Sequence, residues 1–174
     1  MRNISVILFL SVILFGFTIP KKIETKIEKE IKSVFEISSF EKKNLVLSDS
    51  INKNLLVPFK EDNFFKITSN KKLLGYFYYG KAPSKTDVFD FVVIFNEELI
   101  LKKIKIVAYR ENYGNEISSK RWLKQFELLT KEDSAVYREN IQAISGATIS
   151  AKSMTRTINN LLKSLKILQN KNQI

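Results

Sequence analysis

The 174-residue sequence is long enough for one domain with a hydrophobic core, and 44% of its residues are apolar. It contains no cysteine and no histidine. Disulfide bonds, cysteine-ligated metal centres and all catalysis that uses histidine as the base are therefore excluded. A formal charge of +11 favours anionic partners such as a membrane surface or an anionic ligand. If the chain takes part in redox or group-transfer chemistry, a cofactor must supply the reactive group.

An apolar run occupies residues 4–19, with Arg2 before it and Lys21 and Lys22 after it. Its length and position are typical of a signal peptide or a short membrane anchor, which we assign to residues 1–20. We therefore expect export across the inner membrane to a periplasmic location, with or without retention by this segment. A basic exported domain fits a membrane surface better than nucleic acid, so no nucleic-acid partner is expected.

The next part of the chain predicts an amphipathic helix followed by short strands. Isoleucines at helical spacing predict a helix over residues 22–35, within an N-terminal unit that spans residues 21–40. Strands are expected at 43–48, 55–59, 64–68 and 73–79, with a turn at 70–72 and a chain break at Gly80–Ser84.

The strongest strand pattern lies at residues 88–95 and 99–109, which flank Asn96-Glu97-Glu98 and predict an antiparallel hairpin. In the second strand Ile104, Ile106 and Ala108 are expected to share one face, and Lys103 and Lys105 the other. The fold class expected is α+β, a single domain whose antiparallel sheet has one face on helices and one face in water.

The remaining elements are a glycine loop, two helices and a tail. We expect a loop at 110–116 with Gly114 as its hinge, a short helix at 118–126, a polar loop at 131–140, a long amphipathic helix at 149–168 and a polar tail at 169–174. No internal repeat separates these elements, so one domain is expected over residues 41–168.

The run Ile144-Ser145-Gly146-Ala147-Thr148-Ile149-Ser150 combines small residues and hydroxyl side chains at the start of the long helix. Small residues and free N–H groups at a helix N-terminus suit a phosphate. The simpler interpretation is that Ser145, Thr148 or Ser150 caps the helix. Both interpretations remain open from these residues alone.

Three pieces of the chain, in this order, resemble the FMN-binding domain family. They are the hairpin DFVVIF…LILKKIKIVAY, the segment YRENYGNEISSKRWLKQF and the motif ISGATIS. Members of this family include the C subunit of sodium-translocating NADH:quinone reductase and the G subunit of the Rnf complex. The resemblance covers residues 73–168 and implies an FMN cofactor, no resident metal, and a role as an electron carrier with membrane redox proteins as donor and acceptor rather than as a stand-alone catalyst.

The resemblance also implies site residues. In the family a phosphoester joins FMN to the second hydroxyl residue of the S-G-A-T run, here Thr148, and a flavin transferase makes the bond from FAD. Gln142 stands where the transferase motif usually has Asp, so covalent FMN, non-covalent FMN and no cofactor all remain open. The cofactor-binding residues expected beside Thr148 are Ser145, Gly146, Ala147, Ser150, Glu111, Tyr113, Gly114, Glu116 and Trp122.

Several of these residues have a second interpretation. Tyr109, Tyr113 and Trp122 are candidates for the aromatic wall of the flavin site, although core packing with Phe126 suits Trp122 slightly better. Lys152, one helical turn after Thr148, is expected to add positive charge. The alternative function is a non-redox binding module that uses its basic face on a membrane or an anionic polymer.

Overall fold

The computed structural model of the protein describes residues 19–60 and 62–174. The predicted export segment therefore lies outside the described residues, except for its last two positions. The helices are α1 (Lys21–Phe35), α2 (Asp49–Asn52), α3 (Lys120–Leu123) and α4 (Thr148–Asn170), with 3-10 turns η1 (Asn115–Ser118) and η2 (Lys124–Phe126). The strands are β1 (Glu41–Asn44), β2 (Phe64–Ser69), β3 (Lys72–Pro83), β4 (Val88–Asn96) and β5 (Leu101–Ala108).

The strands form one antiparallel sheet in the order β1-β2-β3-β4-β5, so each strand pairs with its neighbour in sequence. The predicted hairpin is confirmed as β4 and β5, whose pairs include Val93 with Ile104. The α+β class with an antiparallel sheet is confirmed as well. No helix of the described residues is long and apolar enough to cross a membrane.

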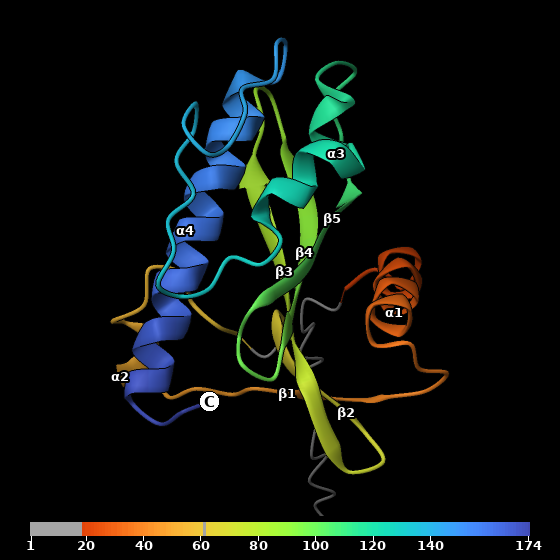
Figure 1. Ribbon diagram of the computed structural model, residues 1–174, viewed down its shortest axis with the longest axis vertical. Coiled ribbons are helices and arrows are strands. Elements are labelled where there is room, and N and C mark those ends of the chain that lie inside the picture. Colours follow the sequence, from red (N-terminus) through yellow and green to blue (C-terminus); the bar gives the residue numbers. More distant parts are fainter. Residues whose placement is uncertain (1–18, 61) are drawn as a thin grey trace, which may run out of the picture.

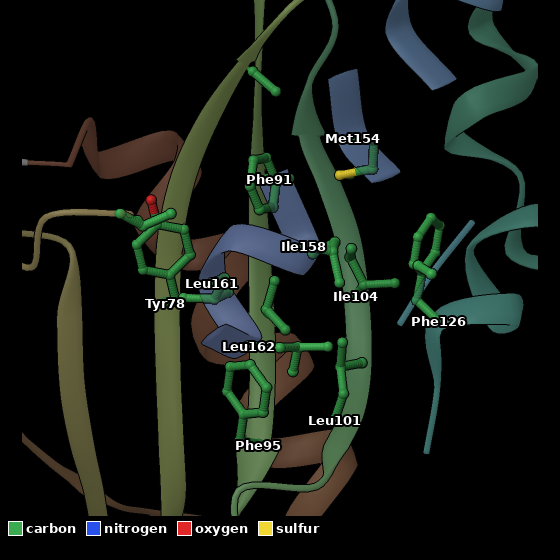
Figure 2. Close-up of a cluster of buried hydrophobic side chains, with 14 of the residues drawn as sticks. Tyr78, Phe91, Phe95, Leu101, Ile104, Phe126, Met154, Ile158, Leu161 and Leu162 are labelled. Carbon is green, nitrogen blue, oxygen red and sulfur yellow. The ribbon is translucent and has the colours of Figure 1, made fainter. Parts of the chain in front are cut away.

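The main core lies between one face of the sheet and α4. Buried Phe91, Phe95 and Ile104 of the sheet meet Ile158 and Leu162 of α4. Figure 2 shows these side chains filling the space between the strands and the helix, with Phe126 closing one side. The apolar stripe at helical spacing in residues 154–168 is therefore the face that α4 buries.

The second face of the sheet is also covered, which corrects the prediction of a face exposed to water. Figure 1 shows α1 and α4 on opposite sides of the strands. Ile27 and Ile31 of α1 pack against Phe77 and Ile94 in a second core. The alternating lysines of β5 led to the prediction of a face exposed to water. Lys105 instead forms an ion pair with Glu30 of α1.

Ala108 was predicted to share a face with Ile104 and Ile106, and this is wrong. The register between β4 and β5 shifts between Asp90 and Phe91, opposite the end of β5. As a result Ala108 packs against the second core, while Ile104 and Ile106 belong to the first.

The predicted break at Gly80 is wrong, because β3 continues through it to Pro83. A Cβ on Gly80 would lie 2.4 Å from the ring of Tyr78 and 2.5 Å from the ring of Phe91. This glycine makes room for two aromatic rings and does not form a turn.

Two of the early strand predictions also need correction. β1 ends at Asn44, although Leu45 N–H still donates to Phe64 O at 2.9 Å, and residues 55–59 form no strand. The backbone of this second segment is bonded to side chains: Val57 N–H donates to Ser164 Oγ at 3.0 Å, and Phe59 N–H donates to Asn52 Oδ1 at 2.9 Å. Pro58 lacks an N–H group, so it cannot donate to a neighbouring strand.

The helix predicted at 118–126 is divided into η1, α3 and η2. Ser119 starts α3, and its side chain accepts a hydrogen bond from the N–H of Trp122. The long C-terminal helix begins one residue earlier and ends two residues later than predicted, at Thr148 and Asn170.

Candidate functional site

The motif at residues 144–150 forms a tight turn that leads into α4. Gly146 has φ of 77°, which favours glycine, and Ala147 is the N-cap residue. No side chain caps the helix, so the prediction that Ser145, Thr148 or Ser150 is a cap is wrong. The first backbone bond is from Ala151 N–H to Ala147 O at 2.9 Å, so the N–H groups of residues 148–150 have no acceptor within the helix.

A cleft of about 270 Å³ opens at this helix start. Its wall brings together three segments that are distant in sequence: the turn after β3, the loop after β5 and the start of α4. The lining residues are Lys85, Tyr109, Tyr113, Gly146, Ala147, Thr148, Ile149 and Ser150. The predicted residues Tyr113, Gly146, Ala147, Thr148 and Ser150 thus share one cleft.

Thr148 and Ser150 have different surroundings in the cleft. Thr148 is exposed at the first helical position, whereas Ser150 is 3% exposed and its Oγ lies 3.2 Å from Tyr109 Oη. Ile149 and Tyr113 add apolar surface, being 50% and 46% exposed. Of the serine and threonine residues in the cleft wall, Thr148 is therefore the exposed one.

Gly114 brings the loop after β5 against this turn. A Cβ there would lie 3.0 Å from Ala147 Cβ, 3.1 Å from Gly146 O and 3.1 Å from Tyr109 Oη. The residue also has φ of 72°, so another side chain would be strained as well as crowded. Gly114 supports the cleft from behind and does not line it.

Glu111 joins the same loop to the turn after β3. Its carboxylate accepts hydrogen bonds from Thr86 N–H and Thr86 Oγ1, both at 2.7 Å. The backbone N–H is the largest cause that lowers the pKa of Glu111 to about 2. Tyr113 follows on this loop, and partial burial, with the negative charge of Glu111 in second place, raises the pKa of its phenol.

The remaining predicted residues do not line the cleft. Trp122 is buried against Phe126, with ring centroids 5.2 Å apart, so it belongs to the core. Its Nε1 donates to Gln142 O at 2.8 Å, which ties α3 to the segment before the motif. Glu116 lies exposed in η1, and Ser145 is exposed on the turn beside the cleft.

The sequence missed the cation of the cleft. Lys85 lies in the wall with its Nζ 5.6 Å from the centroid of the Tyr113 ring. Lys152, which was expected to add charge, lies over the ring of Tyr137 at 5.7 Å and does not line the cleft. No sequence pattern identifies Lys85, because only the fold brings residues 83–87 beside α4.

A buried carboxylate of β4, that of Asp90, lies beside the first residues of the loop after β5. Asp90 is 1% exposed, and Arg110 donates to both of its oxygens, at 3.0 and 2.8 Å. Tyr79 Oη donates to the same carboxylate at 2.9 Å. Burial raises the pKa of Asp90, but the hydrogen bonds from Arg110 and Tyr79 outweigh it and the pKa is lowered.

A larger basic groove of about 530 Å³ runs beside β5, between α1 and α3. Five lysines line it, together with Glu30 and Glu127: these are Lys29, Lys102, Lys103, Lys105 and Lys120. Two of them form ion pairs, Lys103 with Glu127 at 3.3 Å and Lys105 with Glu30 at 3.2 Å. The groove is thus only partly neutralised.

Comparisons with known proteins find a solved structure with a similar fold and a family that matches part of this chain. The crystal structure of Shewanella oneidensis NqrC is similar with a TM-score of 0.59 and 14% sequence identity, over 88% of this chain and 98% of that chain. A comparison with curated protein sequences finds no match. Residues 86–163, which include β4, β5, the glycine loop and the start of α4, match the FMN-binding domain family. The resemblance to the FMN-binding domain family is therefore confirmed over this segment.

Proposed function

We propose that this protein is an electron carrier that holds FMN through a phosphoester to Thr148. The observation that carries the proposal is the exposed Thr148 hydroxyl, which stands at an uncapped helix start in a cleft within the family segment. FMN supplies the redox chemistry when bound. The residues of this chain bind and orient it, because none of the cleft residues is a histidine, cysteine or carboxylate.

The chemistry of the cleft suits a phosphate joined to an aromatic ring. The free N–H groups of residues 148–150 and the positive end of the helix favour the phosphate. A Cβ on Gly146 would meet nothing within 4 Å, so the turn leaves open space beside Thr148. Tyr113 and Ile149 present apolar surface for the ring.

The size of the cleft supports a covalent bond. At about 270 Å³ it falls just below the range of about 300–1,000 Å³ that is usual for sites that enclose a small molecule. FMN in this cleft would keep part of its surface in water, and burial would contribute little to retention. A phosphoester removes the need for tight non-covalent binding and leaves the ring accessible to redox partners.

The Thr148 hydroxyl has no histidine, carboxylate or metal site beside it in the described cleft, so the protein is not expected to modify itself. A flavin transferase would join Thr148 Oγ1 to the FMN phosphorus of FAD. The bond between the two phosphates breaks, AMP leaves, and the hydroxyl proton passes to the transferase. Gln142 has an exposed side chain, and its N–H donates to Gln125 Oε1 at 2.8 Å, so its backbone is held while its side chain is accessible to such an enzyme.

The apolar run at residues 4–19 supports export of this domain to the outer side of the inner membrane, where other membrane redox proteins would exchange electrons with it. The fold shared with NqrC is consistent with such partners, including the subunits of a redox complex.

The test is co-expression of the full chain with a flavin transferase, followed by denaturing electrophoresis and detection of flavin fluorescence in the gel. Covalent FMN is expected on the wild-type chain and absent from Thr148→Ala. Ser145→Ala is the matched control, since Ser145 is an exposed hydroxyl residue of the same turn, and it should keep its fluorescence. Fluorescence that survives in Thr148→Ala, or a wild-type chain that never takes up flavin, overturns the proposal.

The basic groove favours a second candidate, a non-redox module that binds anionic membrane lipids or polymers. Lys29, Lys102 and Lys120 line it without an ion pair among the described residues. The absorbance spectrum of the purified protein separates the two candidates. A flavin spectrum contradicts the non-redox function, whereas a colourless protein whose binding to anionic vesicles weakens with salt supports it.

A further inference from the structure

The turn between β3 and β4 places one positive charge in the cleft. Among the described residues that line the cleft, only Lys85 is charged. Its Nζ lies over the ring of Tyr113 at 5.6 Å, a cation–π contact on the aromatic part of the wall. Lys85 precedes the segment that matches the family, which starts at residue 86, so the family match assigns it no role.

The backbone on both sides of Lys85 is held in place. Ser84 donates from N–H and Oγ to Asp87 O, at 2.8 and 2.7 Å, and closes the turn. Thr86 is bonded twice to Glu111 on the loop that carries Tyr113. Ser153 Oγ of α4 donates to Pro83 O, which fixes the same turn to the helix of Thr148. These contacts set the position of Lys85 relative to both Thr148 and Tyr113.

The phosphate and the ring of FMN would meet different groups here. The N–H groups at the start of α4 would bind the phosphate on Thr148. Lys85 instead contacts Tyr113, the aromatic side chain against which the ring would pack. A cation beside a flavin ring stabilises the negative charge that the ring gains on reduction.

We propose that Lys85 lies beside the flavin ring and raises its reduction potential. This inference rests on the proposed function. In the reaction concerned, a reduced redox partner gives two electrons to the oxidised neutral ring, and one proton comes from water, so the reduced ring carries one negative charge. The ammonium group of Lys85 favours this product over the oxidised ring.

The test is a potentiometric titration of the full FMN-loaded chain, followed by flavin absorbance, for wild type, Lys85→Gln and Lys85→Arg. We expect Lys85→Gln to make reduction about tenfold less favourable, a decrease of about 30 mV for a two-electron couple. Lys85→Arg keeps the charge and should keep the potential. Lys152→Gln, which removes a lysine of α4 outside the cleft, is the matched control and should shift the potential much less.

Salt provides a second readout, since the effect of an exposed charge is screened. The difference in reduction potential between wild type and Lys85→Gln should shrink between low salt and 1 M salt, where the screening length is about 3 Å.

Equal reduction potentials for wild type and Lys85→Gln, both with FMN on Thr148, overturn this inference and leave the proposed function standing. A wild-type chain without FMN overturns the proposed function and this inference with it. A decrease in Lys85→Arg equal to that in Lys85→Gln shows that packing rather than charge sets the potential, and also overturns it.

Discussion

The carboxylate of Glu111 connects two of the three segments that form the cleft. It accepts the N–H and the hydroxyl of Thr86, and so joins the turn that carries Lys85 to the loop that carries Tyr113. Hydrogen bonds to a charged carboxylate favour its ionised form, which accounts for a pKa of about 2 in this half-buried side chain. This connection depends on charge, so acid must weaken it.

We expect NMR titration of the Glu111 carboxyl group to give a pKa of about 2, below the ordinary value of 4.5. A lowered pKa means that the contribution of Glu111 to stability is complete above about 4.5 and is lost as the pH falls through about 2. Thr86→Val removes the hydroxyl and keeps the N–H, so the pKa should rise only part of the way to 4.5. Asp133, whose pKa is lowered by Thr130, is the internal control and should not change.

A Glu111 pKa near 4.5 in the wild-type protein would contradict the double hydrogen bond. The comparison between Glu111 and Lys85 also shows what sequence can supply at this scale. Tyr113 could be placed near the cleft because it adjoins Gly114 within a segment that resembles a family, whereas Glu111, which was expected to bind the cofactor, is not among the residues that line the cleft. Lys85 could not, because its place depends on the hydrogen bonds of Pro83 and Thr86 to other elements.

At the scale of the elements, β3, β4 and the residues after β5 are joined by polar side chains that meet at the buried carboxylate of Asp90. Asp90 of β4 receives hydrogen bonds from Tyr79 of β3 and from Arg110, two residues after β5. Arg110 also donates to Val88 O at 2.8 Å. The glycine loop starts at Arg110, so this group fixes the direction in which the loop leaves the sheet.

We expect Arg110→Ala to lower the free energy of unfolding by about 1.5–3 kcal/mol, the usual effect of losing hydrogen bonds to a charged group. The lower part of this range applies because the Arg110 side chain is 37% exposed. Tyr79→Phe removes one hydrogen bond and should cost about 0.5–1.5 kcal/mol. Urea unfolding measures both variants.

The pH dependence of the same variants tests the cause. The pKa of Asp90 is lowered in the folded protein, so the contribution of this group is present above the ordinary value of 3.8 and is lost as the pH falls through the folded pKa. The stability difference between wild type and Arg110→Ala should therefore narrow in acid below pH 3.8. A stability difference between wild type and Arg110→Ala that is the same above and below pH 3.8 would show that Arg110 acts through packing alone.

The elements that could be predicted from sequence are those with a regular pattern. The alternation in β4 and β5 and the helical spacing in α4 are set by local geometry. The end of β3 could not be predicted, because the rings of Tyr78 and Phe91 leave room only for glycine at position 80. The conformation of residues 55–59 could not be predicted either, because their backbone is hydrogen-bonded to the side chains of Asn52 and Ser164. Contacts between distant elements decided these cases, and a local pattern does not contain them.

At the scale of the whole molecule, the sheet lies between two cores, and α1 forms the second with the help of partly buried neighbours. The face below α1 contains buried Phe65, Phe77 and Ile94, which would meet water without it. The helix starts two residues after the apolar run at 4–19. If that run is retained as a membrane anchor, one of the two alternatives expected from the sequence, the first element after it is packed on the sheet, and the domain is held close to the membrane.

We expect Ile31→Ala in α1 to lower the free energy of unfolding by about 2–5 kcal/mol, because it leaves a cavity in a fully buried site. Ile158→Ala in α4 is the matched variant, since both isoleucines are 0% exposed. Similar losses for the two variants are expected if α1 and α4 unfold together with the sheet. Chemical unfolding followed by circular dichroism measures them, with hydrogen exchange of the α1 amides beside it. Rapid exchange limited to α1 in Ile31→Ala, with global stability unchanged, would show that α1 opens independently and that the sheet is stable with one face uncovered.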